Sequence, residues 1–176
     1  LEPDSGAYNL GLARRLRGHL DLAALERALS RLVARHETLR TTFSMIDDVP
    51  RRVIHGARPV PLPLTDLQGA GDAEERAQAL VIAEAGRGFD LEAGPLLRAG
   101  VIRLDQDDHI LVLTLHHIIV DGWSMGVLNR DLGALYAASV EGTERELPSL
   151  PLQYGDYAAW QQGRIESGGL DEQLNR

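Results

Sequence analysis

The chain has 176 residues, enough for one domain with a sizeable core. Hydrophobic residues make up 44% and charged residues 25%, as in an ordinary globular protein. The formal net charge of −8 argues against a nucleic-acid partner, because no basic field would attract phosphates. The lack of cysteine excludes disulfides, thiolate metal sites and thiol nucleophiles. Without a membrane-length apolar run or a signal-peptide pattern, we expect a cytoplasmic protein with no membrane partner.

The first part of the chain contains one clear amphipathic pattern. Residues 1–10 (LEPDSGAYNL) are expected to be a linker, and the basic run after them favours the solvated edge of a helix or strand: Arg14, Arg15 and Arg17. Four leucines then recur at helical spacing: Leu22, Leu25, Leu29 and Leu32. They predict a helix within residues 19–40, with Asp21 as its N-cap.

Short elements follow this helix. The segments 41–45 and 51–56, which flank turn residues, predict a hairpin. The proline-rich segment 58–67 is expected to be extended and irregular, because proline lacks a backbone donor. A second helix is predicted over 72–86, with Asp72 as its cap.

Strands are predicted over 96–104 and 109–117, with a polar turn between them. The next helix begins near Gly122 and ends near Gly142, and one of its faces is apolar: Met125, Leu128, Leu132 and Leu135. A further helix is predicted over 152–167, and residues 170–176 have the pattern of another helix just beginning. Helices and strands therefore intermix, which predicts an α/β class with a mixed or antiparallel sheet.

The stretch TLHHIIVDGWSMGVL, residues 114–128, concentrates the polar chemistry. Its GWSMG run matches the G-x-S-x-G turn of serine hydrolases, between a predicted strand and a predicted helix. In that fold the histidine base follows the serine in the chain, yet no histidine follows Ser124. We therefore interpret Ser124 as a residue of the first helical turn, where its hydroxyl can bond backbone donors.

A metal site is the second interpretation of this stretch. His116, His117 and Asp121 are residue types that bind zinc or iron. Adjacent residues of a strand point to opposite faces, so both histidines cannot hold one ion without distortion. No third ligand is evident nearby, and this disfavours a metal.

The third interpretation treats the two histidines as unequal. Strand alternation places His117 on the face of Leu113 and Leu115, and His116 with Thr114. One imidazole can then face a cavity and transfer a proton near neutral pH, while the other packs inside. Asp121 would fix the local turn through a salt bridge or through backbone hydrogen bonds.

The segment HHIIVDGWSMGVLNRDL, 116–132, resembles the HHxxxDG motif of condensation domains of nonribosomal peptide synthetases, which serve antibiotic biosynthesis. Three other segments resemble further motifs of that family in the same order: RHETLRTTF (35–43), FDLEAGPLLRAGVIRL (89–104) and YGDYAAWQ (154–161). The DGWSMG sequence is similar to the condensing subtype rather than to epimerisation or heterocyclisation domains. The motif that helps to set donor stereochemistry lies outside this sequence.

The resemblance implies a chloramphenicol acetyltransferase-like α/β sandwich, in which a mixed β-sheet packs with helices. Family members have two such lobes in a V, with the active site in the cleft between them. Residues 1–176 are expected to be the N-terminal lobe, with the C-terminal lobe absent and the lobe inactive on its own.

The resemblance also implies the reaction, an acyl transfer that forms an amide bond between carrier-bound aminoacyl or peptidyl thioesters. His117 and Gly122 would be catalytic, the histidine as base or positioning group and the glycine through its N–H near the oxyanion. His116, Asp121 and Arg40 would be structural, with Arg40 as a candidate ion-pair partner of Asp121. No cofactor is expected on this chain, since phosphopantetheine belongs to the carriers.

The implied partners are donor and acceptor peptidyl carrier proteins, the C-terminal lobe and a neighbouring adenylation domain. The run of Arg14, Arg15 and Arg17 is a candidate basic patch for an acidic carrier. Two alternatives remain open: a non-catalytic lobe that docks carrier proteins, and a stand-alone HxxxD acyltransferase that self-assembles with His117 at a subunit interface.

Overall fold

The computed structural model describes residues 5–143 and 147–167. Its main sheet has the strand order β1-β6-β5-β4, and the strands are β1 (Asn9–Arg17), β4 (Leu64–Asp66), β5 (Leu97–Asp105) and β6 (Asp108–His116). The β1–β6 and β5–β6 pairs are antiparallel, whereas β4 runs parallel to β5. The predicted α/β class with a mixed sheet is therefore confirmed.

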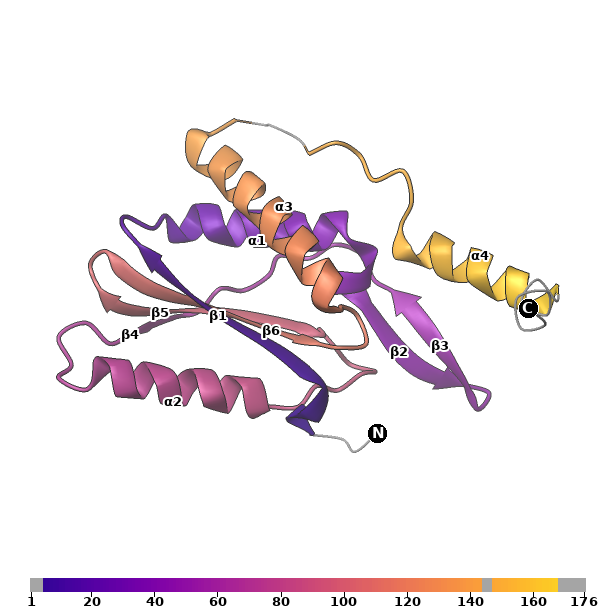
Figure 1. Ribbon diagram of the computed structural model, residues 1–176, viewed down its shortest axis with the longest axis horizontal. Coiled ribbons are helices and arrows are strands. Elements are labelled where there is room, and N and C mark those ends of the chain that lie inside the picture. Colours follow the sequence, from indigo (N-terminus) through magenta and orange to yellow (C-terminus); the bar gives the residue numbers. More distant parts are fainter. Residues whose placement is uncertain (1–4, 144–146, 168–176) are drawn as a thin grey trace, which may run out of the picture.

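Helices cover both faces of the sheet (Figure 1). Helices α1 (Leu22–Arg35) and α3 (Gly122–Glu141) lie on one face, and α2 (Ala73–Gly86) lies on the other. The alternation of side chains along β6 explains this, because Leu113 and Leu115 pack in the core with α1 and α3, whereas Val112 packs with Ala77 of α2. Both faces of the central strand are buried, which accounts for its almost continuous apolar sequence.

A smaller unit lies at the C-terminal end of α1. The 3₁₀ helix η2 (Glu37–Arg40) leads into the predicted hairpin, formed by β2 (Thr41–Ile46) and β3 (Val49–Ile54). Helix α4 (Tyr154–Glu166) lies beside this hairpin, away from the sheet (Figure 1), and Arg52 of β3 donates to the carbonyl of Gly155 at 3.2 Å.

Most helix boundaries follow from caps that the sequence predicts. Asp21 accepts a hydrogen bond from the N–H of Ala24 at 2.8 Å, and Gly142 ends α3 in the left-handed conformation with φ of 63°. Asp72 occupies the N-cap position of α2, but its carboxylate makes no cap hydrogen bond and instead lies 3.8 Å from Arg76. The predicted helix over 170–176 lies outside the described residues.

The N-terminal prediction is wrong from Gly6 onward. Residues 6–8 form the 3₁₀ helix η1 (Gly6–Tyr8), and Asn9 begins β1, which pairs with β6 from Asn9 opposite His116 to Arg17 opposite Asp108. The partner strand lies about a hundred residues later in the sequence, so no local pattern reveals the pairing. The basic run does lie on an edge strand, as one of its two interpretations held.

The proline-rich segment is largely extended and irregular, as predicted, except for the three residues of β4. In the described part of the chain, no helix combines the length and hydropathy that crossing a membrane requires.

Candidate functional site

The end of β6 places the two histidines in different environments. His116 is 7% exposed, and its ring lies 6.1 Å from those of Tyr8 and Phe89. Its Nδ1 accepts a hydrogen bond from the N–H of Ile118 at 3.1 Å. Burial, with a smaller effect of neighbouring His117, lowers the pKa of His116. His116 is thus a neutral packing residue that shapes the turn after the strand.

His117 is exposed and held through its backbone. Its N–H donates to the carbonyl of Tyr8 at 2.8 Å, which extends the β1–β6 pairing by one residue. The side chain lines a cavity of about 260 Å³ between the β6–α3 turn, the first turns of α3, η2 and the start of α4. The predicted inequality of the two histidines is confirmed, since one packs inside and the other faces a cavity.

Asp121 stabilises the start of α3. Its carboxylate accepts from the backbone N–H of Ser124 at 2.8 Å and from the Ser124 hydroxyl at 2.5 Å. These two bonds hold the pKa of Asp121 below its usual value. Of the two predicted ways in which Asp121 could fix the turn, the structure has the backbone hydrogen bond.

Ser124 lies in the first helical turn, as predicted, but its hydroxyl partner differs from the prediction. The hydroxyl donates to the carboxylate of Asp121 rather than bonding a backbone donor. Because the pKa of Asp121 is lowered, its carboxylate is a weak base toward this hydroxyl.

Gly122 is the first residue of α3, and a side chain there would meet open space. Its N–H belongs to the first helical turn, where no intrahelical acceptor exists. Gly122 itself does not line the His117 cavity, but its neighbours Asp121 and Trp123 do.

The expected ion pair between Arg40 and Asp121 is wrong. The Arg40 guanidinium donates to the carbonyl of His55 at 2.5 Å and to Glu37 at 3.4 Å. Arg40 follows α1 through η2 and is directed into the β2–β3 unit, whereas Asp121 is committed to capping α3. The structure therefore brings His117 and Asp121 together and places Arg40 elsewhere.

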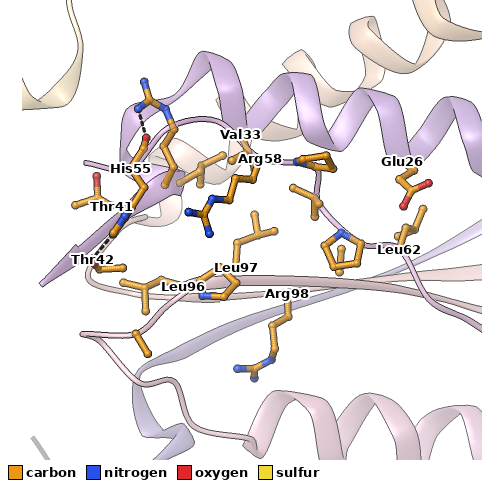
Figure 2. Close-up of a pocket in the computed structure, with 18 of the residues that line it drawn as sticks. Glu26, Val33, Thr41, Thr42, His55, Arg58, Leu62, Leu96, Leu97 and Arg98 are labelled. Atoms are coloured by element: carbon orange, nitrogen blue, oxygen red, sulfur yellow. Dashed lines mark hydrogen bonds between the residues drawn. The ribbon is translucent and has the colours of Figure 1, made fainter. Parts of the chain in front are cut away.

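Arg40 lines a second and larger cavity of about 870 Å³. Figure 2 shows this cavity between α1, the proline-rich segment and the start of β5, with Thr42 and His55 at one end and Glu26 and Leu62 at the other. In the described part of the chain, the two cavities share no lining residue. His117 and Asp121 therefore belong to the smaller cavity alone.

Two residues of the His117 region were missed by sequence reasoning. His36 lines the same cavity, and its Nε2 lies 3.0 Å from a carboxylate oxygen of Asp131, which is 4% exposed. The signal was present in the sequence, since Asp131 interrupts the apolar face of α3 between Leu128 and Leu132. A carboxylate on a buried helical face requires partners, and two of them, Arg35 and His36, come from the end of α1.

Within residues 5–143 and 147–167, no group of three or more histidine, aspartate or glutamate side chains could hold a metal ion.

The basic run of β1 is partly neutralised, because Arg15 pairs with Asp108 and with Glu74, each at 2.6 Å.

Comparison with known proteins gives the family to which the chain belongs. A family model for the condensation domain matches residues 1–175, and the chain belongs to this family. The mixed sheet with helices on both faces is accordingly an instance of the chloramphenicol acetyltransferase-like fold.

The curated relatives are large synthetases. The chain is 46% identical to a linear gramicidin synthase of Brevibacillus parabrevis, over 99% of its own length and 2% of that protein. It is 42% identical to a phosphinothricin tripeptide synthetase of Streptomyces viridochromogenes, over 99% of the chain and 16% of the relative.

Solved structures agree with this assignment. The X-domain from teicoplanin biosynthesis is 39% identical with a TM-score of 0.82, over 95% of this chain and 35% of that one. The starter condensation domain of rhizomide synthetase is 29% identical with a TM-score of 0.77, over 90% and 39% of the two chains. The chain thus spans little more than a third of these structures.

Proposed function

We propose that the chain supplies the catalytic histidine of an amide-forming acyltransfer between carrier-bound aminoacyl or peptidyl thioesters. The observation that carries the proposal is the placement of His117. Its ring is exposed and faces a cavity at the end of the central strand, in a chain of the condensation-domain family.

In this reaction the amine of the acceptor attacks the thioester carbonyl of the donor. The nitrogen forms the new C–N bond, the carbonyl passes through a tetrahedral oxyanion, and the donor thiol leaves. His117 takes or orients the proton that the amine loses, a task suited to an imidazole near neutral pH. Gly122 offers its N–H, free of an intrahelical acceptor, to the developing oxyanion.

Asp121 acts through the backbone in this proposal. By capping α3 it fixes the direction of the helix start, and hence of the Gly122 N–H, relative to His117. The two thioesters reach the cavity on phosphopantetheine arms of the donor and acceptor carrier proteins, which are substrates rather than groups resident on this chain. A C-terminal lobe and an adenylation domain complete the proposed context.

The test is an assay with carriers loaded with donor and acceptor, read by mass spectrometry of the acceptor-bound product. A complete condensation domain that carries this chain as its N-terminal lobe should form the amide, whereas the 176-residue chain alone should form none. A complete domain with retained fold that forms no amide from several loaded pairs would contradict the proposal.

A second candidate is a docking lobe without catalysis. It is favoured by the likeness to the teicoplanin X-domain, which has also been solved in complex with OxyB. Under this candidate the chain would bind a loaded carrier in a pull-down or titration, and His117→Ala would change neither binding nor any product yield.

A further inference from the structure

The cavity contains a second histidine, and this one is oriented by a carboxylate. His36 follows the last residue of α1 and lines the cavity together with His117. Asp121 faces His117 across the β6–α3 turn, but its hydrogen bonds go to Ser124. Within residues 5–143 and 147–167, the cavity histidine with an aspartate partner is thus His36 and not His117 of the HHxxxDG motif.

The partner of His36 is firmly held. One carboxylate oxygen of Asp131 lies 3.0 Å from Nε2 of His36 and 3.1 Å from Nε of Arg35, and the other accepts from Arg130 at 3.3 Å. The Asp131 side chain is 5% exposed and that of His36 is 14% exposed. A buried carboxylate with three donors is rigid, so the imidazole that it binds has one fixed orientation.

This orientation leaves Nδ1 of His36 as a free acceptor. A carboxylate only accepts, so the proton of the neutral ring lies on Nε2 and the lone pair lies on Nδ1. Among the described residues no side-chain or backbone donor bonds to Nδ1. Nδ1 is also not one of the buried side-chain atoms that lack a partner, which belong to Asn9, Arg40, His109 and Thr114. Nδ1 is therefore not sealed in the core, and His36 lines the cavity that His117 also lines.

The groups around His36 keep its ring neutral. Burial, opposed by the Asp131 hydrogen bond and supported by Arg35 and Arg130, lowers the pKa of His36. Glu37 is engaged by Arg40 on η2, and the other cavity residues that titrate are His117, Asp121 and Tyr154. A neutral acceptor in a cavity that Asp121 also lines suits an ammonium or amine donor.

We propose that His36, oriented by Asp131, contacts the acceptor substrate and accepts a hydrogen bond at Nδ1 from its attacking amine. This rests on the proposed amide-forming function and deepens it. His36 holds the nucleophile, whereas His117 handles the proton that the nucleophile loses. The class of ligand is a primary amine next to a thioester, and the site lies at the junction of α1, η2 and α3.

Two substitutions separate this role from a purely structural one. In His36→Gln the terminal amide reaches the place of Nε2 and donates to Asp131, while the acceptor at the place of Nδ1 is lost. In His36→Asn the side-chain oxygen lies near the place of Nδ1, while the bond to Asp131 is lost. The two variants thus remove the two ring contacts one at a time.

The proposal predicts opposite effects in the complete domain. His36→Gln should keep the wild-type unfolding midpoint, raise the KM for the acceptor about three- to tenfold and leave the donor KM unchanged, as expected for one lost hydrogen bond. His36→Asn should unfold at a lower temperature and keep the acceptor KM within about threefold of wild type. A His36→Gln domain with the wild-type acceptor KM overturns the proposal.

A binding measurement tests the contact between His36 and the amine without requiring that the domain form an amide. The ¹⁵N resonance of His36 Nδ1 should shift when an alanyl N-acetylcysteamine thioester is added to the wild-type domain, and the N-acetylated analogue should cause no shift. Absence of a shift at saturating thioester overturns the proposal even if amide forms. A shift in a domain that forms no amide supports the contact while the catalytic function fails.

Discussion

Two histidine–aspartate neighbourhoods flank the same cavity, and they differ in what the aspartate does. At the β6–α3 turn Asp121 is exposed and caps a helix, so among the described residues the His117 ring has no carboxylate partner that orients it. At the α1–α3 junction Asp131 is buried and binds His36 directly. Burial explains the difference. A carboxylate in the core needs hydrogen bonds from side-chain donors, whereas an exposed carboxylate can accept hydrogen bonds from the free backbone N–H groups at a helix start.

The largest expected effect is on catalysis. His117→Ala in a complete domain should lower the rate of amide formation by about 10²–10⁴-fold, the range of general acid–base contributions. The unfolding midpoint should stay near wild type, because the ring is exposed and the fold uses only the backbone of His117. Loaded-carrier kinetics and thermal unfolding measure the two effects, and near-normal turnover would remove His117 from the mechanism.

A substitution in the buried neighbourhood of Asp131 and His36 should lower the stability of the fold. Asp131→Ala leaves Arg35 and His36 without their shared partner and should cost about 3–5 kcal/mol of unfolding free energy, as for a broken buried pair. Denaturant titration measures this, with Asp121→Ala as the exposed counterpart. An Asp131→Ala loss below that of Asp121→Ala would contradict the assigned difference between the two carboxylates.

Loss of the exposed carboxylate should have a smaller effect. Asp121→Ala removes the N-cap of α3 and should lower the unfolding free energy, but by less than Asp131→Ala does. Its damage to activity should accompany this loss of folding or solubility. A variant that is as stable as wild type yet inactive would show that Asp121 acts directly on substrate.

The pH dependence of stability should reflect the buried histidines. The folded-state pKa values of His36 and His116 lie below the usual value of 6.5, so the unfolded chain binds more protons in the window just below pH 6.5. Their stabilising contribution is present above that pH and is lost as the pH falls through the window. Denaturant titrations from pH 5 to pH 7 should show rising stability, less steeply for His36→Gln than for wild type.

The smallest expected effect is that of Ser124→Ala. It removes the hydroxyl bond to Asp121 but keeps the backbone N–H bond that caps the helix. Stability should fall by about 1 kcal/mol or less, and amide formation should persist. Complete loss of activity in a folded Ser124→Ala domain would restore the nucleophile interpretation.

Local patterns in the sequence predict most of this fold but miss its long-range pairings. The leucine spacing of α1, the cap at Asp21 and the stop at Gly142 are local signals, and the structure has them. Strand β1 was missed because its partner β6 is remote in the sequence and because Arg14 interrupts the apolar alternation of Leu10, Leu12 and Leu16. Only the pairing with β6 makes this segment a strand.

For the site, as for the fold, the sequence predicts what depends on local patterns and misses what depends on long-range contacts. Strand alternation separates His116 from His117, and the structure shows that separation. The partner of Arg40 was predicted wrongly, and His36 with Asp131 was missed, because both depend on how α1 and η2 approach α3 in three dimensions. The catalytic roles of His117 and Gly122 stay predictions.

The most direct measurement is a single-turnover comparison of His117→Ala and Asp121→Asn in a complete domain. Asparagine caps a helix about as well as aspartate, so Asp121→Asn removes the charge and keeps the turn. The structure predicts that Asp121→Asn retains amide formation within about tenfold of wild type, while His117→Ala loses about 10²-fold or more. The reverse order, an active His117→Ala domain and an inactive but folded Asp121→Asn domain, would contradict the assignment of the chemistry to His117.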